Sequence, residues 1–178
     1  RPPSAGPYVF NEGELENFRR RGKDLREVKA EKAEQTGKFY GLMMDHVRKV
    51  LSDVKRVYPG YNEEKGYELA GFVWFQGWND MVASGTYPNR GQPGGYDAYT
   101  DCLAHFIRDV RKDLEAPKMK FVIGVMGVGG PLEQYASQRY VPIHGAFREA
   151  MAAPSLMPEF KGNVFAVRTA KFWDMRLK

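Results

Sequence analysis

The sequence predicts an α/β protein with a parallel sheet in a three-layer α/β/α arrangement. Three short apolar segments, at residues 69–76, 119–126 and 163–169, have the length and composition of buried strands. The longer segments between them carry apolar residues at three- and four-residue steps, as amphipathic helices do. This alternation predicts a parallel sheet whose strands are joined by right-handed helical crossovers.

The segment before the first strand predicts a surface connection followed by helices. Residues 1–13 contain three Pro and two Gly, which favour irregular surface structure. Residues 14–35 are highly charged with few apolar positions, so we expect a peripheral helix interrupted near Gly22. Residues 38–57 show a stronger helical pattern, which Pro59 and the glycine after it bring to an end.

The first strand and the elements after it follow in a regular order. The apolar residues of 69–76 are nearly continuous, which predicts burial on both faces of a parallel sheet. A loop with four Gly and two Pro spans residues 81–95, and loops of this length beside a strand end are often functional. Residues 96–114 predict an amphipathic helix, and residues 132–152 are helical in part.

Composition narrows the possible functions. The 178 residues suffice for one domain, and the net charge is +5. Residues 12–38 hold eight basic and seven acidic side chains, so we expect a solvated surface and no nucleic-acid partner. No window has the length of a membrane span, and no signal peptide is visible. The single Cys102 falls in a helical pattern and predicts a buried small side chain.

Polar residues follow the first strand directly, in the order Gly77, Trp78, Asn79, Asp80. Ligands of open parallel sheets bind outside the carboxyl ends of the strands. Glycine permits a sharp turn there, and an Asn side-chain amide can donate to a developing oxyanion. The alternative is a tight turn in which Asn79 is hydrogen-bonded to the backbone.

The run from Trp74 to Asp80 (Trp-Phe-Gln-Gly-Trp-Asn-Asp) resembles the third conserved block of the SGNH hydrolases. More narrowly, it is similar to carbohydrate esterases of the sialate O-acetylesterase and acetylxylan-esterase type. The likeness extends over residues 38–174 and is most specific at 67–130. It implies a flavodoxin-like sheet, a serine hydrolase and an acetylated carbohydrate as substrate. Esterases of this kind are often exported.

The resemblance implies a role for each residue of the block. Gly77 and Asn79 match the oxyanion-hole positions, and Gln76 matches a residue that lines the pocket. Asp80 matches a residue that orients the loop. Trp78 stands where these esterases usually have Glu, and it would either stack on a sugar or cap the core. Asn79 stands where the narrower group usually has Ser or Ala.

Two parts of the resembled machinery are missing from the sequence. The family's nucleophile is a Ser in a Gly-Gln-Ser-Asn-like block, and its base is a His after the last strand. None of the five serines has the strand-to-turn context, and His144 stands in the wrong order. We therefore expect residues 1–178 to be one partial SGNH-type domain, incomplete at both ends and inactive alone, with residues 14–35 as a charged helical insertion.

Two other functions compete with the esterase. A non-catalytic carbohydrate-binding or interaction domain on the same scaffold would use Trp78, Tyr87 and Arg90 around the loop. A flavodoxin-like nucleotide binder would use the glycine turn at residues 127–130. We expect no cofactor and no metal site, because no spacing of His, Cys or carboxylates suits a metal ion and no phosphate-binding loop of the Walker type is present.

Overall fold

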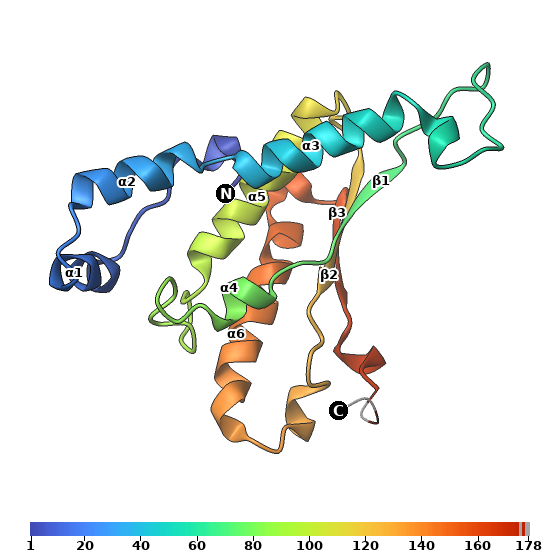
Figure 1. Cartoon of the computed structure of the whole chain (residues 1–178). Coiled ribbons are helices and arrows are strands. Elements are labelled where there is room, and N and C mark those ends of the chain that lie inside the picture. The colour runs from blue at the N-terminus through green and yellow to red at the C-terminus, as the bar shows by residue number, and fades with distance from the viewer. Residues whose placement is uncertain (175, 177–178) are drawn as a thin grey trace.

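The structure is a computed structural model that describes residues 1–174 and 176. Helices and strands alternate along the chain as predicted (Figure 1). The strands are β1 (Gly71–Trp74), β2 (Lys120–Val125) and β3 (Val164–Arg168). The helices are α1 (Glu12–Arg20), α2 (Leu25–Glu34), α3 (Lys38–Leu51), α4 (Trp78–Val82), α5 (Asp97–Asp113) and α6 (Val141–Ala152). The predicted α/β class is confirmed.

The three strands form one parallel sheet in the order β1-β2-β3. Trp74 of β1 pairs with Ile123 of β2, and Ile123 pairs with Ala166 of β3. Parallel strands end at the same edge of a sheet, so the segments that follow them leave from one side of the molecule. We call residues 75–82 the β1 loop and residues 126–130 the β2 turn.

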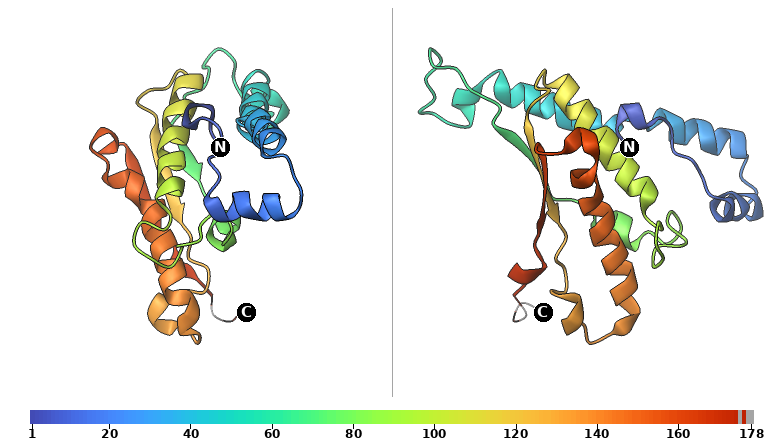
Figure 2. Two further views of the ribbon diagram at one scale, coloured as in Figure 1. Left: turned by 90° about the vertical axis from the view of Figure 1, so that its left-hand side faces the viewer. Right: turned by 180° about the vertical axis from the view of Figure 1, so that it is seen from behind.

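Helices α5 and α6 cover one face of this sheet, as both views of Figure 2 show. Phe121 and Ile123 of β2 are fully buried against them, as is Phe147 of α6. Trp74 points to the same face, where its ring centroid lies 4.3 Å from that of Phe106 in α5. Burial of such large side chains supplies most of the stability of the fold.

The opposite face of the sheet carries apolar side chains that remain exposed. Val73 is 71% exposed and Phe75 is 66% exposed, and on β3 Phe165 and Val167 are 45% and 44% exposed. The expectation that β1 is buried on both faces is therefore wrong for the described part of the chain. The apolar residues of β1 point to both faces of the sheet, but the described helices cover only one of these faces. Exposed apolar patches of this kind mark interaction surfaces.

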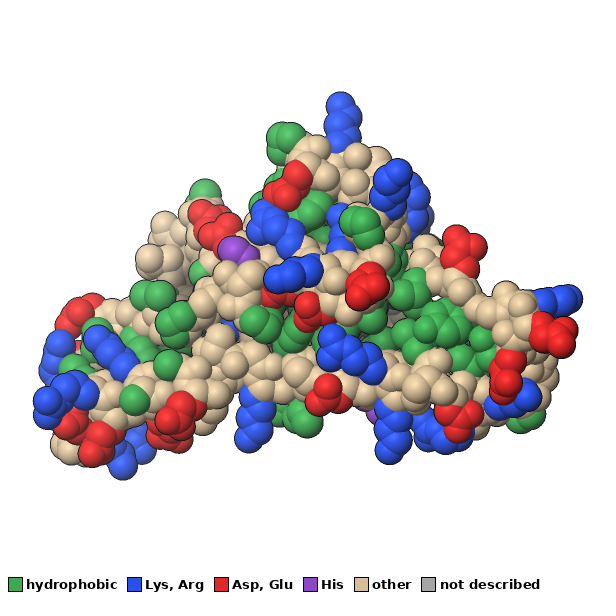
Figure 3. All heavy atoms as spheres, turned by 90° about the horizontal axis from the view of Figure 1, so that it is seen from above, with side chains coloured by type: hydrophobic (Ala, Val, Ile, Leu, Met, Phe, Trp, Pro, Cys, Tyr) green, Lys and Arg blue, Asp and Glu red, His purple; other side chains and the backbone are tan. Residues whose placement is uncertain are grey.

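The charged segment before α3 forms an arm of two helices, α1 and α2. Gly22 lies between them with a φ of +65°, which confirms the predicted interruption. Asn11 and Glu14 form a capping box at the start of α1. No residue of either helix is buried, and Figure 3 shows basic and acidic side chains intermixed on the arm. The arm has the solvated surface that its composition predicts.

Two helix boundaries differ from the sequence prediction. The helix expected over residues 38–57 ends at Leu51, because the Asp53 side chain caps a separate 3-10 turn at Val54–Arg56. The partly helical stretch 132–152 becomes regular only at α6, where Pro142 occupies the first turn. Helix α4 begins inside the motif after β1, where the sequence predicts only a turn and a loop.

Candidate active site

The β1 loop turns sharply at Gly77, which is buried while its neighbours Gln76 and Trp78 are exposed. A Cβ atom at this position would lie 2.7 Å from the ring of Phe147 and 3.4 Å from Met126 Cε. Because the Phe147 ring is fully buried, it has little room to move away. Glycine therefore allows the β1 loop to pack directly on α6 and on the start of the β2 turn.

Two buried tyrosines fix the backbone of the β1 loop. Tyr99 donates to the carbonyl of Gln76 at 3.0 Å, and Tyr96 donates to the carbonyl of Met81 at 2.7 Å. Burial raises the pKa of Tyr96 to about 12 and raises the pKa of Tyr99 as well. Both phenols therefore stay protonated near neutral pH and remain hydrogen-bond donors.

Asp80 links the start of the β1 loop to the segment that follows the loop. Its carboxylate accepts from Tyr87 at 3.1 Å and from the Gln76 side-chain amide at 3.3 Å. Burial, followed by the charge of Asp80, raises the pKa of Tyr87. Arg90 is also used internally, since its guanidinium donates to the carbonyl of Val82 at 2.7 Å. Tyr87 and Arg90, which the sequence suggested for sugar binding, both hold the backbone or side chains of this region in place.

The exposed side chains of the β1 loop include Gln76, Trp78 and Asn79, which lie around the turn at Gly77. Trp78 is 51% exposed, which places about half of its surface in solvent. Within the described residues the Asn79 side chain forms no hydrogen bond, so the alternative in which it stabilises the turn is wrong. Its amide group keeps two donors that can bind a ligand.

The β2 turn lies beside the β1 loop and is held by Arg148 of α6. Gly129 and Gly130 have φ values of +84° and +82°, which only glycine adopts readily. Arg148 donates to the carbonyl of Val128 at 3.0 Å and to that of Gly130 at 2.8 Å. A phosphate cradle requires amide groups that face the ligand, whereas here two carbonyls face a cation. This geometry does not support the nucleotide-binding hypothesis.

Comparison with protein-family models matches residues 22–156 with the carbohydrate esterase family described as sialic acid-specific acetylesterase. The chain belongs to this family. The match includes β1, β2, α6 and both segments at the strand ends, and it confirms the resemblance found in the sequence. It begins at residue 22, within the segment expected to be an insertion. No curated protein and no solved structure matches the chain.

No serine and histidine of the described residues form a catalytic pair at the strand ends. Ser4 Oγ lies 2.8 Å from His105 Nδ1, midway along α5, and the Ser4 amide donates to Asp109 at 3.0 Å. These bonds attach the N-terminal segment to α5. His144 Nδ1 instead lies 2.7 Å from the Tyr135 hydroxyl. Burial, followed by the charge of a neighbouring arginine, lowers the pKa of His144.

Metal or thiol chemistry has little support in the part of the chain that the structure describes. No group of three or more His, Cys, Asp or Glu among the described residues could hold a metal ion. Burial raises the pKa of the Cys102 thiol, and a reactive thiolate requires the opposite shift. None of the helices over residues 1–174 is long and apolar enough to cross a bilayer.

Proposed function

We propose that this chain is the part of a carbohydrate O-acetylesterase that supplies the oxyanion hole. The observation that carries the proposal is the exposed, unbonded amide of Asn79 in a loop whose backbone is fixed by buried tyrosines. A donor that is already in position when charge develops on the ester oxygen lowers the barrier without reorganisation. Family membership supplies the esterase class.

In this proposal the five residues from Gln76 to Asp80 each have a role. Asn79 and the backbone at Gly77 donate hydrogen bonds to the oxyanion. Asp80 orients the loop through its bonds to Tyr87 and to the Gln76 side chain. Gln76 and Trp78 line the site for the acetylated sugar, and the exposed indole ring of Trp78 can stack on a sugar face.

The nucleophilic Ser and the basic His of this esterase come, in our proposal, from outside residues 1–178. Two observations support this partial-domain proposal. The one Ser–His hydrogen bond of the described residues joins Ser4 to His105 on α5 and not at the strand ends. The face of the sheet that carries Val73 and Phe165 also lacks a covering layer among the described residues.

The role of Asn79 is tested by Asn79→Ala in the catalytically complete esterase. We expect kcat for an acetylated sugar to fall by roughly 10²- to 10³-fold, as when other oxyanion donors are removed. KM and thermal stability should change little, because Asn79 is exposed and holds no structure in place. Asn89→Ala, at an exposed position of the next loop, is the control and should keep full activity. An unchanged kcat in Asn79→Ala would disprove the assignment.

The exposed ring of Trp78 favours a second candidate, a carbohydrate-binding domain without catalysis. Titration of the complete protein with acetylated glycans, followed by an ester-hydrolysis assay, separates the two functions. Binding without hydrolysis supports the second candidate, and hydrolysis supports the first. Robust turnover by residues 1–178 alone, abolished by an internal Ser or His substitution, would contradict the partial-domain proposal.

A further inference from the structure

Residues 4–11 form a strap that joins helix α5 to the segment beside the candidate site. At one end, the Ser4 backbone amide donates to the Asp109 carboxylate of α5 at 3.0 Å. At the other end, the Asn11 side-chain amide donates to the carbonyl of Gly85 at 2.7 Å. The strap is therefore attached to the body of the protein at both of its ends.

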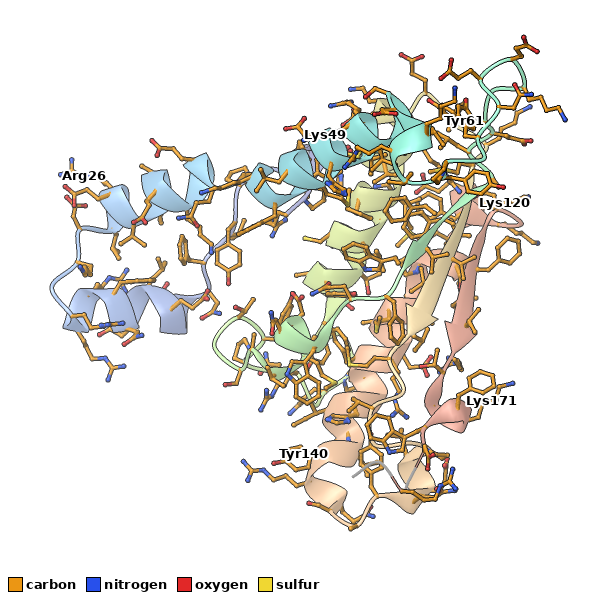
Figure 4. All side chains as sticks on the ribbon, turned by 45° about the vertical axis from the view of Figure 1, so that its right-hand side comes forward. Arg26, Lys49, Tyr61, Lys120, Tyr140 and Lys171 are labelled. Atoms are coloured by element: carbon orange, nitrogen blue, oxygen red, sulfur yellow. The ribbon has the colours of Figure 1, made fainter. Side chains whose placement is uncertain are left out.

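The strap leads into the arm of α1 and α2. Figure 4 shows Arg26 at the outer end of the arm, pointing away from the sheet. Asn11 stands at the start of α1, where its Oδ1 atom accepts from the Glu14 amide at 3.0 Å and caps the helix. Both ends of the Asn11 amide group are thus in use, one for the arm and one for Gly85. The family match begins at residue 22, so the strap lies outside the matched residues.

Gly85 lies at the tip of a turn, residues 83–87, that follows α4 directly. The Tyr87 backbone amide closes this turn by donating to the carbonyl of Ala83 at 2.9 Å. The hydroxyl of the same buried tyrosine donates to Asp80 of α4 at 3.1 Å. Turn and helix are therefore one hydrogen-bonded unit. Since α4 has only five residues, it is too short to be stable alone, and its position depends on contacts of this kind.

A second contact joins the strap to the same turn. The Tyr8 hydroxyl donates to Glu14 of α1 at 2.7 Å. Burial raises the pKa of Tyr8 to about 12, and a hydrogen bond with Thr86 partly opposes this rise. The strap thus contacts two consecutive residues, Gly85 and Thr86, directly before the tyrosine that binds Asp80.

We propose that Asn11 is a positioning residue, which acts through Gly85 and Tyr87 to fix α4 and thereby the Asn79 amide. The proposal rests on the proposed function, because it concerns where the oxyanion donor is held. A donor stabilises the transition state only when it lies within hydrogen-bond distance of the position that the oxyanion will occupy. A loosened turn would let α4 move and would weaken that hydrogen bond without altering any group that reacts.

The first test measures the turn and requires no catalysis. Asn11→Asp keeps the shape and the helix cap but has no donor for Gly85, and Asn11→Ser does the same without adding a charge. Amide hydrogen exchange of the 178-residue chain is followed by NMR. We expect the Tyr87 amide to exchange about two- to fivefold faster in both variants, as for the loss of one exposed hydrogen bond. The Phe18 amide inside α1 should be unaffected, because the cap remains.

The second test measures the reaction in the catalytically complete esterase. Asn11→Ser should lower kcat for an acetylated sugar about two- to fivefold and leave KM nearly unchanged, since the strap contacts α4 only through the turn. The same substitution in an Asn79→Ala background should lower kcat no further, because Asn11 acts through Asn79. Asn17→Ser, at an exposed position of α1, is the matched control in both tests and should behave as wild type.

The outcomes separate this proposal from the function on which it rests. Tyr87 exchange equal to that of the Asn17→Ser control would overturn the proposal. Faster exchange with an unchanged kcat in Asn11→Ser would also overturn it, as would an equal fall of kcat with and without Asn79. An unchanged kcat in Asn79→Ala alone would instead overturn the proposed function.

Discussion

The β1 loop and the β2 turn lie side by side at the ends of neighbouring strands, but they are held in different ways. The β1 loop is fixed by several hydrogen bonds from the neutral hydroxyl groups of separate tyrosines, and it leaves the Asn79 amide exposed. The β2 turn depends on one buried cation, Arg148, that contacts two of its carbonyls. Neutral donors that leave an amide exposed suit a charge that develops during a reaction, whereas the cation of Arg148 is engaged in holding the carbonyls of the turn.

Helix α6 supports both segments through consecutive residues. Phe147 packs beneath Gly77 of the β1 loop, and Arg148 binds the β2 turn. A change at either residue therefore acts on one segment directly and on the other through a short, rigid stretch of helix. We therefore expect a large loss of unfolding free energy when Arg148, the single support of the β2 turn, is replaced. We expect smaller losses when one of the several tyrosine hydrogen bonds to the β1 loop is removed.

The largest loss of stability is expected from Arg148→Met, which removes the side chain that holds the β2 turn. The carbonyls of Val128 and Gly130 would lose their charged partner in a buried position. We expect the free energy of unfolding to fall by about 2 to 4 kcal/mol, measured by urea denaturation of the full chain. Arg139→Met, at an exposed position in the same part of the chain, should change it by less than about 0.5 kcal/mol. Similar small losses in both variants would show that the turn does not need Arg148.

The next largest loss is expected from Gly77→Ala in the β1 loop. The new Cβ would lie 2.7 Å from the buried ring of Phe147, so loop and helix must separate. Overpacking of this kind costs about 1 to 3 kcal/mol of unfolding free energy. Gly85→Ala is the matched control, because nothing lies within 4 Å of its Cβ position. A Gly77→Ala protein as stable as the control would mean that the contact with Phe147 is not tight.

Much of the fold was predictable because it depends on local patterns. The apolar runs that became β2 and β3 ended where predicted within a residue or two, and the polar motif after β1 led to the correct family. The exposed face with Val73 was not predictable, since a continuous apolar run does not show which layer covers it. Arg148 was missed because an arginine in a helical pattern is usually solvated. Its burial depends on the β2 turn, which the fold brings to α6.

A smaller loss of stability is expected when one hydrogen bond from a tyrosine to the β1 loop is removed. Tyr96→Phe deletes the donor to the Met81 carbonyl, and Tyr99→Phe deletes the donor to the Gln76 carbonyl. Each should lower the free energy of unfolding by about 1 kcal/mol, because the remaining contacts keep the loop in place. Tyr58→Phe, at an exposed position, should change it by only a few tenths. A loss as large as that of Arg148→Met would remove the contrast between the two segments.

The smallest expected effect is a pH dependence of stability that comes from His144 of α6, near the β2 turn. Burial and the charge of Arg148 lower the pKa of His144, which lies against Tyr135, itself a hydrogen-bond partner of Arg148. Below the unfolded pKa of about 6.5, the unfolded chain binds a proton that native His144 does not yet accept. The free energy of unfolding should therefore fall as the pH decreases from about 7.5 through 6.5 toward the native pKa. Tyr96 and Tyr99, which hold the β1 loop, do not titrate in this range, because the ordinary tyrosine pKa of about 10 is already higher and burial raises their pKa values further.

This dependence is isolated by comparing wild type with His144→Gln, because carboxylates contribute equally to both proteins. Urea unfolding at about pH 7.5 and about pH 5.5 should show a larger loss in wild type than in the variant. Since His144 is only half-buried, we expect a modest difference that is smaller than the effect of either tyrosine substitution. Equal losses would mean that His144 titrates alike in the folded and unfolded chains. The β2 turn would then be no more sensitive to pH than the β1 loop, and only the cation of Arg148 would distinguish the two.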